Sequence, residues 1–380
     1  MQTQRSHIDN LKKETSPFLF TDLISRIESL SLMVRQRHFA SDNNAGIVPE
    51  ALEALQEANT GHVSGYGNDA ITERARAAVA EIFETECAVY FVSTGTTANC
   101  LALSPRVASY QAVLAHEFSH LETDECNALG QFIPGAKILA VPGANGKIDA
   151  TALVAIADSQ RPVHSSEPAA LSVTNATELG TAYRPEELAA LSELARPRRW
   201  FFHVDGARFA NAVAGSKYSP ADLTWRSGID VLSFGGTKNG LAIGDAIVFF
   251  GTKSVPSFEY RLKQSGQLTS KMRFLAAPWI GALRDGAWLK RASHANNMAA
   301  RLEAGLSRFH QIRVLFPREA NAVFAKLPEK TTQHLHGIGW HFYSDVGPGS
   351  GARLMCSWDT TEEDVDRFVA DAGSTLNAGE

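Results

Sequence analysis

The 380-residue sequence contains no run of about 18 apolar residues, so it offers no candidate transmembrane helix. It has no long basic run and a formal net charge of −5, which argues against nucleic acid as a partner. The N-terminus lacks a charged segment followed by an apolar one, so no secretory signal is expected. The cysteines have neither metal-like nor disulfide-like spacing: Cys87, Cys100, Cys126 and Cys356. We therefore expect a cytoplasmic protein with reduced thiols and no membrane partner.

What the chain does have is the composition of a globular protein with an ample core. Hydrophobic residues make up 44% and charged residues 20% of it. Its length and changes in texture predict an N-terminal extension (1–37), a large domain (38–285) and a small C-terminal domain (286–380). In the extension, four apolar residues share one helical face and predict a packing or oligomer helix: Leu23, Ile27, Leu30 and Val34.

Seven short segments of mostly apolar residues alternate with helical stretches. They are residues 88–93, 112–115, 138–141, 170–174, 200–204, 230–234 and 246–250. Strands that are apolar on both sides are typical of a parallel sheet covered by helices. The pattern predicts an α/β fold with a mainly parallel sheet of about seven strands, followed by a smaller α+β domain. Ligands of such sheets bind at the carboxyl ends of the strands.

One lysine, Lys238, lies directly behind an apolar strand and a Gly-Gly turn in VLSFGGTKNG. Burial there would lower its pKa and free the amine for carbonyl chemistry, whereas an isolated loop lysine would be solvated. A second apolar strand ends at Asp205 in HVDGAR. Pyridoxal phosphate (PLP) needs such a pair, with an amine to hold its aldehyde and a carboxylate to keep its ring nitrogen protonated.

A phosphate site is predicted where the strand of residues 88–93 leads into Thr94, Gly95 and Thr96 at the start of a helix. Backbone N–H groups and the helix dipole favour an anion there. By itself the pattern is weak, because threonine and glycine cap many helices. Its position at the end of a strand, like those of Lys238 and Asp205, is the stronger argument.

A competing signal is HEFSH, residues 116–120, which matches the H-E-x-x-H motif of zinc peptidases. The motif requires both histidines on one helix, but His116 directly follows an apolar strand. The extended form needs glycine and histidine where this chain has Thr123 and Cys126. A zinc hydrolase that uses a nearby carboxylate as third ligand remains a remote alternative, and we expect no metal.

Several motifs together resemble the PLP-dependent threonine aldolases of fold type I, in their bacterial low-specificity branch. The resemblance extends from residue 38 to about 368. It is carried by FASDNNAG, SGYGNDAIT, STGTTAN, HEFSHLETDE, HVDGARFANAV, FGGTKNG, KMRFLAAPW and ARLMCSW. It implies retro-aldol cleavage of L-threonine, L-allo-threonine and related β-hydroxy-α-amino acids to glycine and an aldehyde. It also implies a homotetramer built as a dimer of dimers.

The resemblance assigns roles to particular residues. Lys238 would hold the cofactor's aldehyde, Asp205 would pair with its ring nitrogen, and His120 would stack on the ring. The phosphate would be bound by Thr94, Gly95, Thr96 and Arg273, the last from the same or the neighbouring subunit. The substrate would be held by Ser41, Arg208, Arg353 and Tyr66, with Arg208 also close to the cofactor.

Alternatives stay open for several of these residues. Arg208 could be the ion-pair partner of a buried acid, Arg353 a strand-end charge and His120 a core histidine. Some aldolases of the family carry a second histidine where this chain has Thr177. The candidates for the base that deprotonates the substrate hydroxyl are therefore His120, Glu125, Thr177 acting through water, or water itself. Another PLP lyase reaction on the same scaffold, such as β-elimination or phenylserine or 3-hydroxyaspartate cleavage, is the second functional hypothesis.

Overall fold

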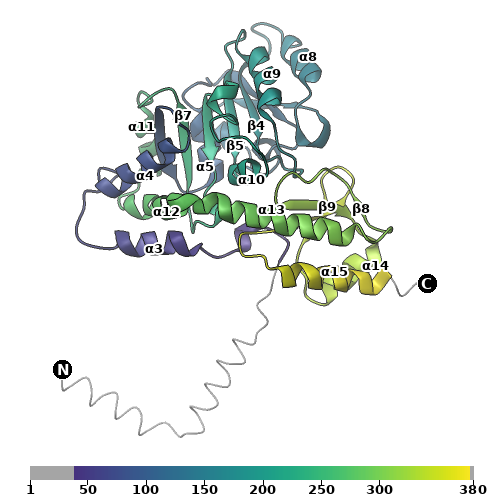
Figure 1. Cartoon of the computed structure of the whole chain (residues 1–380). Helices are drawn as coiled ribbons and strands as arrows, with labels where there is room; N and C mark the ends of the chain where they lie inside the picture. The colour runs from purple at the N-terminus through teal and green to yellow at the C-terminus, as the bar shows by residue number, and fades with distance from the viewer. Residues whose placement is uncertain (1–37, 377–380) are drawn as a thin grey trace, which may run out of the picture.

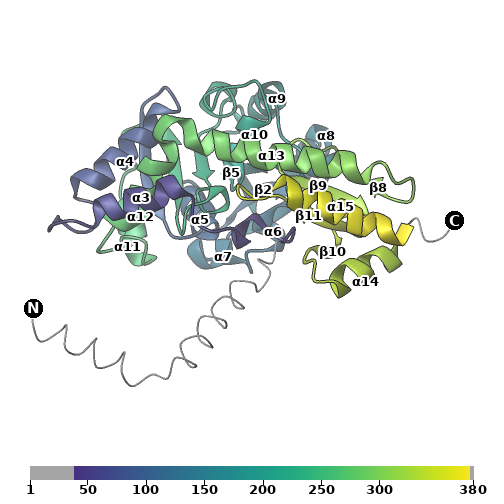
Figure 2. The same ribbon diagram turned by 60° about the horizontal axis from the view of Figure 1, so that its bottom comes forward.

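The computed structural model describes residues 38–376, so the helix expected within residues 1–37 lies outside the described part. The chain forms a large α/β body and a smaller α+β body, with α12 (Arg273–Leu283) and α13 (Ala287–Leu306) running from one to the other (Figures 1 and 2). A kink at Arg284–Gly286 separates these two helices. The division at residue 285 stays a prediction, although it coincides with this kink. Among residues 38–376, none of the helices has the length and apolarity required to cross a membrane.

The large sheet has seven strands. They are β1 (Cys87–Val92), β2 (Gln111–His116), β3 (Lys137–Val141), β4 (Glu167–Thr174), β5 (Phe201–Gly206), β6 (Val231–Phe234) and β7 (Asp245–Phe250). Their order is β1-β7-β6-β5-β4-β2-β3. Only β7 runs antiparallel, to both of its neighbours. This confirms the mainly parallel sheet. Each predicted strand is present, since short apolar segments are suited to strands that are covered on both faces.

Helices cover both faces of the large sheet. The helices and short 3-10 turns of this body are η1 (Asp42–Asn44), α3 (Pro49–Ala58), α4 (Ala70–Glu81), α5 (Gly95–Leu103), α6 (His120–Thr123), α7 (Ala128–Phe132), η2 (Ala144–Gly146), α8 (Ala150–Asp158), α9 (Pro185–Ala195), α10 (Phe209–Ala214), η3 (Trp225–Ser227), η4 (Thr237–Asn239) and α11 (Phe258–Gln264). Several begin at a sequence signal for a helix start. Pro49 opens α3, and the Asp69 side chain caps α4 by accepting the N–H of Thr72.

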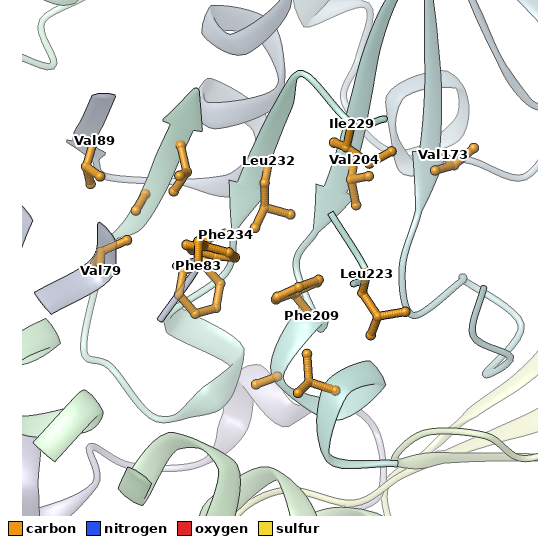
Figure 3. Close-up of a cluster of buried hydrophobic side chains, with 14 of the residues drawn as sticks. Val79, Phe83, Val89, Val173, Val204, Phe209, Leu223, Ile229, Leu232 and Phe234 are labelled. Atoms are coloured by element: carbon orange, nitrogen blue, oxygen red, sulfur yellow. The ribbon is translucent and has the colours of Figure 1, made fainter. Parts of the chain in front are cut away.

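The main core lies between one face of the sheet and helices α4, α10 and α12. In it Phe83, Phe209 and Phe234 meet edge to face, with ring centroids 5.8 Å apart for Phe209–Phe234 and 5.9 Å for Phe83–Phe234 (Figure 3). Such edge contacts add specificity to apolar burial. The opposite face is buried mainly under α5, α7 and α11. Because both faces are packed, the strand ends are held in fixed positions for a site.

The small body contains an antiparallel sheet of order β10-β11-β9-β8 backed by helices. Its elements after α13 are β8 (Arg313–Val314), β9 (Ala322–Lys326), α14 (Glu329–Gly337), β10 (Tyr343–Val346), β11 (Gly351–Met355) and α15 (Glu362–Leu376). Phe39 donates its N–H to the carbonyl of His341 and accepts the N–H of Met355. The first described residues are therefore tied to this sheet, which brings η1 next to the ends of the large-sheet strands.

Candidate active site

A cavity of about 290 Å³ opens at the carboxyl ends of β4, β5 and β6. Seven residues that the sequence pointed to line it: Thr94, Gly95, Thr96, His120, Asp205, Arg208 and Lys238. A larger depression of about 650 Å³ lies at the opposite ends of the strands and has Arg106, Trp200 and Asp230 in its wall. That depression contains neither the lysine nor the strand-end aspartate, so the chemistry converges on the smaller cavity.

Lys238 is positioned by a turn that only small residues and a buried acid permit. It lies in η4, directly after β6 and the Gly-Gly pair. A Cβ on Gly236 would come within 2.6 Å of the Gly244 carbonyl oxygen, so a larger residue would clash with backbone. The Asp245 carboxylate accepts the N–H groups of Gly236 (2.7 Å) and Thr237 (3.3 Å). Asp245 was not predicted, because its partners are backbone groups that only the fold brings to it.

The pKa of the Lys238 ammonium is lowered, first by the positive charge of Arg208 and second by burial. The carboxylates of Asp42, Asp205 and Asp245 oppose this shift. Lys238 makes no hydrogen bond or ion pair with any residue between 38 and 376 that would immobilise the amine. An amine that loses its proton more easily than a solvated lysine is suited to attack a carbonyl carbon.

Asp205, at the end of β5, is the start of a chain of buried polar groups. Asn99 donates to Asp205 Oδ2 (2.9 Å) and to Glu125 Oε1 (2.8 Å), and the same Glu125 oxygen lies 2.8 Å from His120 Nδ1. The backbone N–H of Ala207 donates to Asp205 Oδ1 at 3.0 Å. These two donors, one on each oxygen, fix the orientation of the Asp205 carboxyl at the cavity.

His120 is the first residue of α6 and is not a core histidine, since 37% of its side chain is exposed. The hydrogen bond to Glu125 is the main reason why the pKa of His120 is raised, and burial opposes it. That bond holds the ring through Nδ1, and His120 is part of the cavity lining. Glu125 was predicted only as one candidate base; its buried carboxyl here orients His120.

The predicted phosphate site is a helix start that faces the cavity. Thr94 caps α5, with its hydroxyl accepting the N–H of Thr97 at 3.2 Å. A Cβ on Gly95 would meet only the Asp245 carboxylate, at an ordinary contact distance of 3.4 Å, so the helix start is not crowded by the protein. Threonine hydroxyls and free N–H groups at the positive end of a helix are donors that fit a phosphate.

Arg208 lines the cavity, but one edge of its guanidinium is already engaged. Its Nε and Nη2 donate to Asp42 Oδ2 and Oδ1 at 2.8 and 2.9 Å, and Asn321 Nδ2 donates to Asp42 Oδ2 at 3.1 Å. Burial alone would raise the pKa of Asp42, but the Arg208 charge and these hydrogen bonds lower it overall. One edge of the Arg208 guanidinium is therefore in an ion pair with a buried acid, as the alternative interpretation expected. A substrate carboxylate could bind only to the remaining N–H groups.

Arg353 and Ser41 lie beside the cavity rather than in its lining. Arg353, on β11, donates from Nη2 to the Ala40 carbonyl at 3.0 Å and lies over the Tyr343 ring, 4.8 Å from its centroid. Its Nε is buried without a hydrogen-bond partner among the described residues. Burial, and next the positive charge of Arg208, lower the pKa of Arg353, so the two arginines repel each other electrostatically. An anion between them would satisfy both.

Three predicted residues are not brought to the cavity within one chain. Tyr66 is 47% exposed and lies under Lys263, whose Nζ is 4.7 Å from its ring centroid. Arg273 donates to the Thr60 carbonyl at 3.3 Å. Thr177 is buried, with its hydroxyl 2.8 Å from that of Thr181. None of the three lines the cavity.

The HEFSH segment does not have zinc-site geometry. His116 ends β2; it accepts the N–H of Phe118 at Nδ1 (3.1 Å), and its Nε2 lies 3.1 Å from the Gly143 carbonyl. His120 belongs to the separate helix α6. Within residues 38–376 no cluster of three or more His, Cys, Asp or Glu side chains could hold a metal ion. The motif match arose from a strand end and a helix start, so the zinc-hydrolase alternative is wrong.

Glu178 is another lining residue that the sequence did not point to. Its Oε1 accepts the Thr174 hydroxyl and the backbone N–H of His120, both at 2.8 Å. Its Oε2 is buried with no hydrogen-bond partner in the described part of the chain. Burial, and next the charge of Asp205, raise the pKa of Glu178 to about 7. The only sequence signal was its place beside Thr177, which by itself does not distinguish a lining residue from a buried neighbour.

A strand-end lysine, a strand-end aspartate and a helix-start phosphate cradle around one cavity, on this sheet, define the architecture of a fold type I PLP enzyme. Comparison with known proteins agrees. The family model described as beta-eliminating lyase matches residues 38–330. A low specificity L-threonine aldolase of Pseudomonas sp. (strain NCIMB 10558) is 46% identical over 344 residues, which span 90% of this chain and 99% of that protein.

Two solved structures extend the comparison. The threonine aldolase of Leishmania major has a TM-score of 0.84 at 28% identity and covers 89% of this chain and 99% of its own. A C-DES mutant with glycine covalently linked to its PLP cofactor shares the fold, with a TM-score of 0.64 at 17% identity over 90% of this chain and 97% of its own. The chain belongs to the beta-eliminating lyase family, among the threonine aldolases. The predicted resemblance, fold and cofactor are confirmed.

Proposed function

We propose that this protein is a PLP-dependent carbon–carbon lyase that cleaves L-threonine, L-allo-threonine and related β-hydroxy-α-amino acids to glycine and an aldehyde. One observation carries the proposal: a lysine amine, a buried aspartate and a helix start meet around one cavity in a chain that is 46% identical to a low specificity L-threonine aldolase.

The residues of the cavity fit PLP. Lys238 would hold it through the amine, Asp205 would bind its ring nitrogen, His120 would cover one face of the ring, and Thr94, Gly95 and Thr96 would receive the phosphate. When bound, PLP supplies an electron sink that is conjugated with the α-carbon of the amino acid. The chain's own contribution is to hold the Asp205 carboxyl in place through hydrogen bonds from Asn99 and the Ala207 N–H.

The substrate carboxylate would be received by the free N–H groups of Arg208 and Arg353, with Ser41 beside them. The buried Nε of Arg353, which has no hydrogen-bond partner among the described residues, and the place of Arg208 in the cavity lining support this. Anchoring the carboxylate selects the reaction, because it turns the Cα–Cβ bond, rather than the Cα–carboxylate bond, into the orientation from which it can break. Lys238, which holds a proton less firmly than a solvated lysine, is placed to move a proton at the α-carbon.

Product analysis tests the proposal. Purified protein supplied with PLP is given L-threonine and, separately, L-allo-threonine, and glycine, acetaldehyde, ammonia and keto acid are all measured. Equal amounts of glycine and acetaldehyde are expected. Ammonia with a keto acid would instead identify a β-eliminating enzyme on the same scaffold.

We further propose a dimer of dimers with shared active sites, in the cytoplasm. Tyr66 and Arg273 lie away from the cavity of their own chain, which supports a role in a neighbour's site. Mixing two inactive variants, Lys238→Ala and Arg273→Ala, after dissociation and reassociation should restore activity, because some mixed dimers have one intact site. Light scattering gives the number of subunits, and cell fractionation tests the compartment.

A further inference from the structure

We propose that Glu178 is the base that accepts the proton of the substrate's β-hydroxyl group, an inference that rests on the aldol cleavage proposed above. Glu178 lines the same cavity as Lys238, His120 and Arg208, in the segment that follows β4.

The two oxygens of the Glu178 carboxyl are unequal. Oε1 is fixed by the Thr174 hydroxyl and the His120 N–H at 2.8 Å each. Oε2 is buried and has no partner among residues 38–376. An unpaired buried oxygen on a carboxyl that is otherwise held rigidly is costly for stability. It is also suited to bind a hydroxyl hydrogen that arrives with the substrate.

The other candidate bases are less well placed. His120 is hydrogen-bonded through Nδ1 to Glu125, which raises the pKa of His120 and favours its protonated form. Glu125 is buried, and its Oε1 is already engaged by Asn99 and His120. Thr177 bonds to Thr181 and does not line the cavity. Three carboxyls among residues 38–376 line the cavity. Asp205 has a hydrogen bond on each oxygen, and Asp245 accepts two backbone N–H groups at Oδ1, whereas Glu178 has a buried oxygen, Oε2, without a partner among the described residues.

The proposed step balances without a co-reactant. The proton of the β-hydroxyl moves to Glu178 Oε2, and the O–H electron pair becomes the second bond of the aldehyde C=O. The Cα–Cβ bond breaks and leaves its electron pair on the α-carbon. That carbon then takes one proton and is released as glycine, while Glu178 returns its proton to water. No oxidant or reductant is needed.

The charges that face Glu178 set its protonation. Burial and Asp205 raise its pKa to about 7, while the Thr174 hydroxyl and the backbone N–H groups of Glu178 itself and of His120 oppose the shift. Arg208 and Tyr183 also lie within electrostatic reach of Glu178. A base works in its ionised form, so cleavage should gain rate as the pH rises through about 7. This rise in rate with pH reflects the titration of the coupled group of charges rather than of one isolated carboxyl.

Glu178→Gln, which keeps the shape but removes the base, tests the proposal. Two reactions are compared: aldehyde release from L-threonine, and exchange of the glycine α-proton in D2O, which involves no hydroxyl. We expect cleavage to fall by about a hundred-fold or more, the usual contribution of a general base, and exchange to change by only a few-fold. The dissociation constant of PLP, followed by visible absorbance, should stay within a few-fold of wild type. Glu122→Gln, an exposed change on α6, is the matched control and should alter neither reaction.

The possible outcomes separate the hypotheses. Equal loss of cleavage and exchange, or loss of PLP affinity, would make Glu178 a structural or cofactor-holding residue and overturn the proposal, as would unchanged cleavage. If wild type releases no glycine from threonine, the proposed function itself fails. If the variant does not fold, the test uses the wild-type protein, in which the rate of aldehyde release is divided by the rate of α-proton exchange at each pH. This ratio must rise as the pH increases through about 7, and a ratio that does not change with pH overturns the proposal.

Discussion

The residues proposed to hold the cofactor (the cofactor wall: Asn99, His120, Asp205 and Lys238) and those proposed to hold or orient the substrate carboxylate (the substrate wall: Asp42, Arg208 and Arg353) are assembled differently. In the cofactor wall each side chain lies at the end of a strand or in the first turns of the helix or 3-10 turn that follows. In the substrate wall the three charges come from separate segments: Asp42 from η1, Arg208 from the loop before α10 and Arg353 from the small-body strand β11. The cofactor wall is positioned by the sheet, and the substrate wall by contacts between the two bodies.

This difference predicts different sensitivities. A strand end is held by the whole sheet, so a substitution in the cofactor wall should remove chemistry and leave the fold intact. The substrate wall depends on one buried ion pair, Arg208 with Asp42, supported by Asn321. A substitution there should cost stability and substrate affinity together, because removal of one partner leaves a buried charge uncompensated.

The largest effect is expected for Lys238→Ala. Aldehyde release should fall by at least about a thousand-fold, since a covalent group has no substitute, and the cofactor's visible absorbance should change. The unfolding midpoint should stay near that of wild type. Lys253→Ala, at an exposed lysine that pairs with Glu86, is the control and should keep full activity. Normal turnover by Lys238→Ala would exclude the lysine assignment.

In the substrate wall, Asp42→Asn should lower the free energy of unfolding by about 3–5 kcal/mol, the usual result of removing one partner of a buried ion pair. KM for threonine should rise as well, because Arg208 loses its fixed orientation. Urea unfolding and steady-state kinetics measure the two effects. Asp366→Asn, in the exposed pair with Arg301, should leave both unchanged. A rise in KM without loss of stability would contradict the structural role of the pair.

Asp205→Ala should weaken PLP binding by roughly 10- to 100-fold, which corresponds to loss of a hydrogen bond to a charged group. Spectroscopic titration with PLP measures the dissociation constant. Asp205→Asn should bind PLP almost as weakly as Asp205→Ala, because an amide cannot keep the ring nitrogen protonated. Wild-type affinity in both variants would show that the ring nitrogen does not depend on this residue.

The Asp42–Arg208 pair should also give the stability a dependence on acid pH. The folded pKa of Asp42 lies below its ordinary value of 3.8, so the pair contributes stability above that value and loses it as the pH falls through the folded pKa. The stability difference between wild type and Asp42→Asn should therefore be constant from pH 7 to about 5 and shrink below about 4. A constant difference down to the lowest pH at which both variants fold would argue against a charged pair.

The smallest effect is expected for Ser41→Ala. Ser41 caps the three-residue turn η1 by accepting the N–H of Asn43 at 3.2 Å. Loss of a helix cap costs about 1 kcal/mol. KM should rise only if Ser41 also contacts the substrate. A rise in KM that corresponds to more free energy than the loss of stability would support the assignment of Ser41 to substrate binding. Unchanged stability would show that the cap is not needed.

Two residues of the cofactor wall, Lys238 and Asp205, and the helix start beside them were predictable because strand ends in a parallel sheet share one edge, whereas Asn99 was not predicted. Lys238, Asp205 and the Thr94–Thr96 turn were each found from an apolar strand followed by a polar residue. Asp42 and Asp245 were not, because their partners are Arg208 and the backbone of Gly236, which are distant or invisible in the sequence. The roles of Tyr66 and Arg273 stay predictions, since one chain does not bring them to the cavity.

The seven strands and the amine–acid pair were predictable from the sequence, because hydrophobic patterning and position at a strand end are local properties, and the family was indicated by the motifs. Which carboxyls form hydrogen bonds depends on the fold. In the folded chain Arg208 pairs with Asp42, Thr177 bonds to Thr181 outside the cavity lining, and Glu178 has one oxygen without a partner among the described residues. The physical reason is that burial and hydrogen bonding act on a charge through neighbours in space, and those neighbours are up to 279 residues apart along this chain.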